Sequence, residues 1–98
     1  MTKQAYLSRS AETDLIEIWV YVAENSVEAA DRLIAKIRRQ CQVLADAPGA
    51  GRRRDDVLPG IRSFPLGQYV LSYREADEGI EVARVLSGYR DLRRMLRR

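Results

Sequence analysis

The chain has 98 residues, 46% of them apolar, and a formal net charge of +3, which together suit one domain, residues 1–98, and exclude a disordered chain. No apolar run approaches the ~18 residues that span a bilayer and we find no secretory signal, so we expect a cytoplasmic protein without membrane contact. Histidine is absent, which excludes Ser-His-Asp and Cys-His catalysis and zinc sites of His and Cys, and we expect neither a metal nor a cofactor.

The first quarter of the chain predicts a short strand and a helix. Residues 3–8 are the strand candidate, and Ser8 or Ser10 can cap a helix that runs to about residue 25. Apolar residues recur along this helix at spacings of three and four, and they predict a helix covered on more than one side: Leu15, Ile16, Ile18, Trp19, Val20, Val22 and Ala23. We expect Trp19 in the core, and Tyr21 and Glu24 on the surface.

A second helix should begin after Ser26 and end before Pro48 and Gly49. Its apolar residues form one stripe: Ala30, Leu33, Ile34, Ile37, Cys41 and Leu44. A single short turn joins the two helices, so they should form an antiparallel hairpin. Cys41, the only cysteine, lies on the stripe, which favours a core residue over a nucleophile.

The rest of the chain changes from helical to twofold periodicity after a loop at residues 49–56. Residues 61–65, 68–75 and 80–87 are strand candidates, and Gly79 supplies a positive φ in the hairpin turn before the last one. Residues 91–98 are a candidate terminal helix. The order β-α-α-β-β-β-α predicts an α+β fold: an N-terminal strand and an α-helical hairpin on an antiparallel sheet, with a short basic C-terminal helix.

Arginines mark two candidate binding regions. Arg62, Arg74 and Arg84 come from three successive strand candidates, and antiparallel pairing could group them on the sheet face that the helices leave open. Residues 89–98 carry a charge of +4, while the other 88 residues carry −1. The positive charge of this segment comes from five arginines: Arg90, Arg93, Arg94, Arg97 and Arg98. This asymmetry points to an acidic or polyanionic partner, although the same arginines would also complement the dipole of a solvated helix end.

Several segments in a fixed order carry a family resemblance. The most specific are residues 58–65 (LPGIRSFP), 69–74 (YVLSYR) and 84–91 (RVLSGYRD), with residues 29–33 (AADRL) in the second helix. On these segments the chain resembles the RelE/ParE superfamily of bacterial toxins, and its ParE branch more closely. The match covers nearly the whole chain.

The resemblance implies the toxin half of a type II toxin–antitoxin system, which arrests bacterial growth. A ParD-like antitoxin would neutralise it in a heterotetramer or larger complex, and operator DNA would be contacted only through the antitoxin. The ParE branch poisons DNA gyrase and so blocks replication. Because such antitoxins are acidic, the candidate antitoxin- or target-binding residues are arginines: Arg62, Arg74, Arg84, Arg90, Arg93, Arg94, Arg97 and Arg98.

The runner-up is a ribosome-dependent mRNA endonuclease like RelE. Arg62 and Arg90 match two arginines with which that branch holds the scissile phosphate. However, Leu96 or a neighbour stands where RelE carries its tyrosine, and residues 52–54 are arginines where RelE has lysines. Arginine stays protonated and transfers protons poorly, so we expect no catalytic residue, with Tyr89 as the remaining stand-in.

A nucleic-acid-binding module is the third alternative. The arginines near the C-terminus suit phosphate contacts. The rest of the chain is slightly acidic and lacks paired aromatic positions in a basic groove, so we rank this alternative last.

Overall fold

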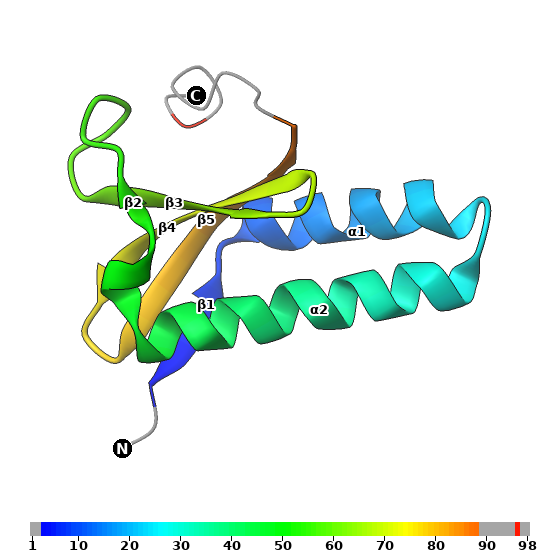
Figure 1. Ribbon diagram of the computed structural model, residues 1–98, viewed down its shortest axis with the longest axis horizontal. Helices are drawn as coiled ribbons and strands as arrows, with labels where there is room; N and C mark the ends of the chain where they lie inside the picture. The colour runs from blue at the N-terminus through cyan, green and yellow to red at the C-terminus, as the bar shows by residue number, and fades with distance from the viewer. Residues whose placement is uncertain (1–2, 89–95, 97–98) are drawn as a thin grey trace.

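A computed structural model describes residues 3–88 and Leu96 (Figure 1). The elements follow one another as β1 (Gln4–Leu7), α1 (Arg9–Ala23), α2 (Val27–Asp46), the 3-10 turn η1 (Pro48–Ala50), β2 (Arg52–Arg53), β3 (Ile61–Leu66), β4 (Tyr69–Ala76) and β5 (Gly79–Ser87). This order confirms the predicted α+β fold and adds the short β2 inside the predicted loop. The predicted terminal helix at 91–98 lies outside the described residues, apart from Leu96.

Both helices begin where the sequence predicts. The Ser8 hydroxyl accepts the N–H of Ala11, and the Ser26 hydroxyl accepts the N–H of Ala29, each at 3.0 Å. Such caps satisfy backbone donors that the first helical turn leaves unpaired. The apolar stripe of α2 is buried or partly buried along its whole length, and burial raises the pKa of the Cys41 thiol to about 11. Cys41 is therefore the core residue that its position predicted.

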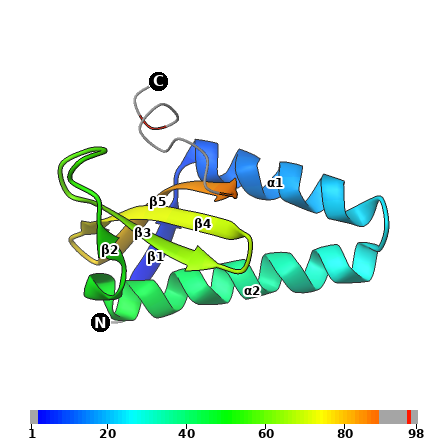
Figure 2. The same cartoon turned by 45° about the horizontal axis from the view of Figure 1, so that its top comes forward.

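The sheet has the strand order β1-β5-β4-β3-β2. Neighbours from β5 to β2 are antiparallel, as predicted, whereas β1 lies parallel to β5, with Gln4 opposite Gly79 and Leu7 opposite Val82. The helical hairpin crosses one face of the sheet and reaches beyond the β3–β4 turn (Figure 2). The principal core lies between this hairpin and the sheet, and its buried members include Leu15, Ile37, Leu44, Leu71, Tyr73 and Val82.

The face opposite the helices is partly covered, whereas the sequence analysis predicted an open face. Val57, Ile61, Val70 and Leu86 form a second buried cluster there, against which Leu58 and Leu96 pack. The loop before β3 folds back over the strand because the N–H of Arg54 donates to the carbonyl of Ile61 at 2.8 Å. Apolar residues in this loop thus cover part of the face that was expected to be exposed.

A β-bulge interrupts β5. Tyr73 lies opposite Val82 and Ser72 lies opposite Arg84, so Ala83 is an extra residue without a partner in β4. A bulge of this kind shifts the alternation of side chains by one position. It brings Val85 onto the helix-covered face with Val82, although three residues separate them.

Helix α1 is less covered than its composition predicted. Ile16 and Val20 are 63% and 51% exposed, so the expectation of cover on more than one side is wrong for the described part of the chain. Trp19 is half-buried, not in the core, and its indole N–H donates to Asp31 on α2 at 2.8 Å. Among the described residues, none of the helices is long and apolar enough to cross a bilayer.

Candidate interaction site

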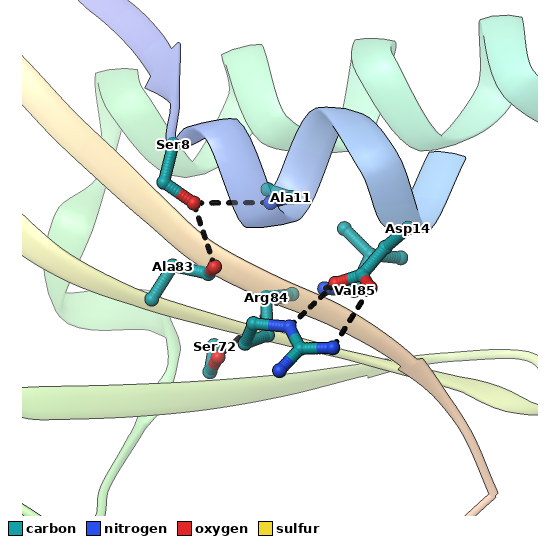
Figure 3. Close-up of polar contacts among 7 residues, drawn as sticks. All are labelled: Ser8, Ala11, Asp14, Ser72, Ala83, Arg84 and Val85. Atoms are coloured by element: carbon teal, nitrogen blue, oxygen red, sulfur yellow. Dashed lines mark hydrogen bonds and ion pairs between the residues drawn. The ribbon is translucent and has the colours of Figure 1, made fainter. Parts of the chain in front are cut away.

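A buried carboxylate joins α1 to the bulged part of β5 (Figure 3). Asp14 accepts two hydrogen bonds from the guanidinium of Arg84, at 2.8 and 2.9 Å, and one from the N–H of Val85 at 2.9 Å. The side chains are 8% and 20% exposed. The bond from Arg84 to Asp14 is the main reason that the pKa of this guanidinium lies above its usual value. Arg84 is therefore held in place by hydrogen bonds from two of its nitrogen atoms to one carboxylate.

At this edge of the sheet, the side chains of Ser8, which caps α1, and of Asp14, within α1, bond the backbone groups that a neighbouring strand would otherwise bond. Strand β1 ends at Leu7, opposite Val82, so it cannot pair with the following residues of β5. There the Ser8 hydroxyl donates to the carbonyl of Ala83 at 2.8 Å, and Asp14 takes the N–H of Val85. Backbone groups at a sheet edge need such partners when they are shielded from water. Together Ser8 and Asp14 fix the start of α1 against β5.

A groove of about 640 Å³ lies beside this junction, between α1 and the ends of β4 and β5. Its α1 side carries Glu17, Ile18 and Tyr21, and its sheet side includes Tyr69 and Leu86. Tyr21 is 71% exposed. Apolar surface next to a few charged groups is typical of protein-binding clefts.

A second groove of about 400 Å³ adjoins the first at Tyr69, beneath the overhanging end of the helical hairpin. Its lining is mostly apolar and includes Val22, Ala29, Leu33 and Leu66. The two grooves thus share Gln68 and Tyr69 in their linings. Apolar surface flanked by polar and charged side chains can accept an amphipathic helix or an extended segment.

The arginines predicted from the strands do not form one cluster. Arg62 lies opposite Tyr73, on the helix-covered side, and donates to the carbonyl of Gly51 at 2.9 Å. Arg74 is exposed and pairs loosely with Glu81 at 3.5 Å, while Arg84 bends around the edge of β5 to α1. Alternation along β3 therefore separates Arg62 from the other two, whereas Arg74 and Arg84 both line a groove of about 430 Å³ on the face opposite the helices. The other candidates lie outside the described residues: Arg90, Arg93, Arg94, Arg97 and Arg98.

The phenol of Tyr73 is a structural group beside Arg62. It is fully buried, donates to the carbonyl of Pro48 at 2.6 Å, and accepts the N–H of Gly51 at 2.8 Å. Burial raises the pKa of this phenol above its ordinary value, although the bond from Gly51 opposes the shift. Tyr73 therefore ties the turn at 48–51, which follows α2, to β4 and is not a ready proton donor near neutral pH.

We expect Tyr73→Phe to lower the free energy of unfolding by about 1–3 kcal/mol, because a buried donor and a buried acceptor lose their partner. Tyr69→Phe is the matched control: its hydroxyl accepts only a 3.2 Å bond from Gln68, so a loss below about 1 kcal/mol is expected. Urea denaturation of both variants measures the difference. Equal losses would contradict a special role for the Tyr73 hydroxyl.

Sequence analysis missed Asp14 and the groove-lining residues Glu17, Ile18 and Tyr21 as site residues. A signal for the Asp14–Arg84 junction was present in β5, where Val82 and Val85 are both apolar at an odd spacing. Within residues 3–88 and Leu96, no group of three or more Cys, Asp or Glu residues is placed to hold a metal ion. The arrangement is suited to binding through shape, apolar contact and charge.

Comparisons with known proteins agree on one family. Residues 5–92 match the family model described as "ParE toxin of type II toxin-antitoxin system, parDE". Toxin ParE1 of Caulobacter vibrioides is 32% identical over 81 residues, covering 82% of this chain and 83% of the relative; Toxin ParE3 of the same organism is 30% identical over 86 residues, covering 87% and 86%. A solved structure, "Chromosomal ParDE TA system from P. aeruginosa", has a TM-score of 0.74 at 23% identity over 90% of this chain and 98% of its own, which shows a shared fold.

Proposed function

The chain belongs to the ParE toxin family of type II toxin–antitoxin systems, and from this premise we propose that it poisons DNA gyrase in the cytoplasm and is neutralised by a ParD-like antitoxin. Residues 1–98 act as a single toxin domain in this proposal. Trapped gyrase blocks replication and arrests growth. The activity requires binding surfaces, not a catalytic centre of the chain's own.

The observation that carries the proposal is the groove pair under the helical hairpin. It combines apolar walls with exposed Tyr21 and Glu17 beside the fixed Asp14–Arg84 pair. A disordered antitoxin segment that folds on binding needs such a preformed surface, because ordering the segment lowers its net affinity. The antitoxin is proposed to occupy these grooves in a heterotetramer or larger complex, and to supply all contacts with operator DNA.

The side chains around Arg62 favour a binding protein over a ribonuclease. The guanidinium of Arg62 and the hydroxyl of Tyr73 are both engaged by backbone groups of the turn at 48–51. RNA cleavage needs groups that give and take protons close to neutral pH. The raised pKa of Tyr73 and the permanent charge of arginine both work against that role.

The arginines at 90–98 are proposed as contacts with gyrase or antitoxin, together with exposed Arg74. Their charge excess remains the supporting observation. Arg84 is proposed to act indirectly, because its guanidinium is committed to Asp14. Arg62 is likewise proposed to position the turn at Gly51 for any partner bound there.

The test incubates the purified chain with DNA gyrase and supercoiled plasmid, and separately with translating ribosomes. We expect linear, gyrase-bound DNA and intact mRNA. Replacing Arg93 and Arg94 with glutamine should weaken gyrase trapping severalfold, whereas the same change at Arg32 and Arg39, exposed on α2, should not. Cleaved transcripts with unaffected plasmid would overturn the proposal in favour of the ribonuclease.

A further inference from the structure

The outer edge of β5 is only partly closed. Strand β1 pairs with its first residues, as far as Val82, and Ser8 and Asp14 occupy the next backbone groups. In the described sheet no strand lies beyond β5 on that side for residues 83–87. The edge therefore continues past Asp14 without a neighbouring strand.

The hydrogen bond from Val85 to Asp14 fixes which backbone groups face outward. Since the N–H of Val85 points away from β4, alternation along a strand turns the N–H of Ser87 the same way. The N–H of Gly88 confirms this alternation, because it donates inward to the carbonyl of Gln68 at 2.6 Å. Ser87 is exposed, so its outward N–H is accessible to a partner.

The larger groove lies directly beside this edge. Val85, Leu86, Ser87 and Gly88 all line it from the sheet side, and α1 overhangs it. An added strand would set alternate side chains toward α1, where Ile18 and Tyr21 offer apolar contact. The acidic and basic residues that line the groove are Asp14, Glu17 and Arg84, and because Asp14 and Arg84 form an ion pair, Glu17 gives the groove an acidic excess.

We propose that β5 from Val85 to Ser87 is a strand-addition site for an extended segment of the antitoxin. This segment pairs its backbone with Ser87, places an apolar side chain against Ile18 and Tyr21, and sets a lysine or arginine beside Glu17. The inference rests on the proposed function, because it assigns the binding mode of the partner that function requires.

A second copy of the chain fits this edge poorly. Asp14 already accepts the N–H of Val85, so the free part of the edge is only about one two-residue repeat of the strand long. Two copies would have only this short stretch for mutual pairing. The approach would also bring two Glu17 carboxylates together. A single foreign segment with its own positive charge avoids the repulsion between carboxylates, and it can use the same short stretch of edge because its side chains also contact the groove beside it.

The experiment compares Ser87→Pro with Ser87→Ala in binding to the purified full-length antitoxin encoded beside this chain. Proline removes the outward N–H while leaving the bonds to β4, so the variant should fold. We expect Ser87→Pro to bind at least about tenfold more weakly than wild type, or about 1.4 kcal/mol, and Ser87→Ala to bind normally. Glu17→Lys should also weaken binding, whereas Glu24→Lys, on an exposed site of α1 outside the groove, should not.

Hydrogen exchange of the Ser87 amide in the wild-type chain provides a second measurement that does not depend on the proline variant. The amide should exchange at least about tenfold more slowly in the complex. Unchanged exchange together with normal binding by Ser87→Pro would overturn this inference alone. Absence of antitoxin binding by the wild type would overturn the proposed function as well, and a dimer of the isolated chain that Ser87→Pro dissociates would identify the second copy as the occupant instead.

Discussion

Replacing Asp14 with alanine is expected to lower the free energy of unfolding by about 3 kcal/mol. The change leaves the guanidinium of Arg84 and the N–H of Val85 without their acceptor at a nearly buried position. The expected loss is at the lower end of the range for broken buried pairs because Arg84, at 20% exposed, can turn toward water. Urea denaturation followed by the fluorescence of Trp19 measures it.

Glu12→Ala is the matched control on the same helix. Glu12 forms its ion pair with Arg38 at 3.0 Å where the two side chains are about half exposed, so a loss of about 0–1 kcal/mol is expected. Asp14→Asn should fall between the two, because the amide oxygen can still accept the N–H of Val85. If Asp14→Ala and Glu12→Ala lose the same stability, Asp14 does not hold α1 on the edge of β5.

Local features of the fold could be predicted because their causes lie within a few residues. Ser8 and Ser26 cap helices through hydrogen bonds to the third residue along, and the α2 stripe repeats every three or four positions. Gly79 marks its hairpin through its positive φ of 141°. Each of these signals depends on residues close together in the sequence, so contacts with distant parts of the chain are not needed to read it.

The site depends on contacts that no local pattern reports. Asp14 and Arg84 are 70 positions apart, and they meet only because the bulge at Ala83 changes the direction of β5. Strict alternation would place Arg84 with Val82 on the helix-covered face. A single extra residue therefore decides whether this arginine lies in the core, on the surface or, as here, around the strand edge.

Periodicity also does not predict which apolar residues are packed against another part of the chain. Helical spacing places Ile16 and Val20 on a widened apolar side of α1, yet both are more than half exposed in the described chain. Val57 and Leu58, which lie between the predicted loop at 49–56 and the next predicted strand, instead cover part of the second sheet face. A pattern specifies which residues share a face and not what lies opposite. This is why the face expected to be open is partly covered, while α1 exposes the apolar residues Ile16 and Val20.

Gly79→Ala is expected to destabilise the chain by about 3 kcal/mol or more, since two penalties combine. A non-glycine residue at φ 141° is strained by about 1–3 kcal/mol, and the new Cβ would overlap the backbone of Gln4 in the parallel strand β1. Backbone cannot yield as a flexible side chain does. Strand β1 must therefore move away, which loosens Ala5 and Leu7 from the principal core.

Gly67→Ala separates these two penalties. Gly67 also has a positive φ, of 61°, but a Cβ there meets nothing within 4 Å, so only the strain of about 1–2 kcal/mol is expected. Thermal unfolding compares the two losses, and hydrogen exchange of the amides at 4–7 locates the larger one. Strand β1 should lose protection in Gly79→Ala and keep it in Gly67→Ala. The same exchange pattern in both variants would mean that β1 adapts to the added methyl group, and that the close approach of Gln4 to Gly79 does not hold this strand in register.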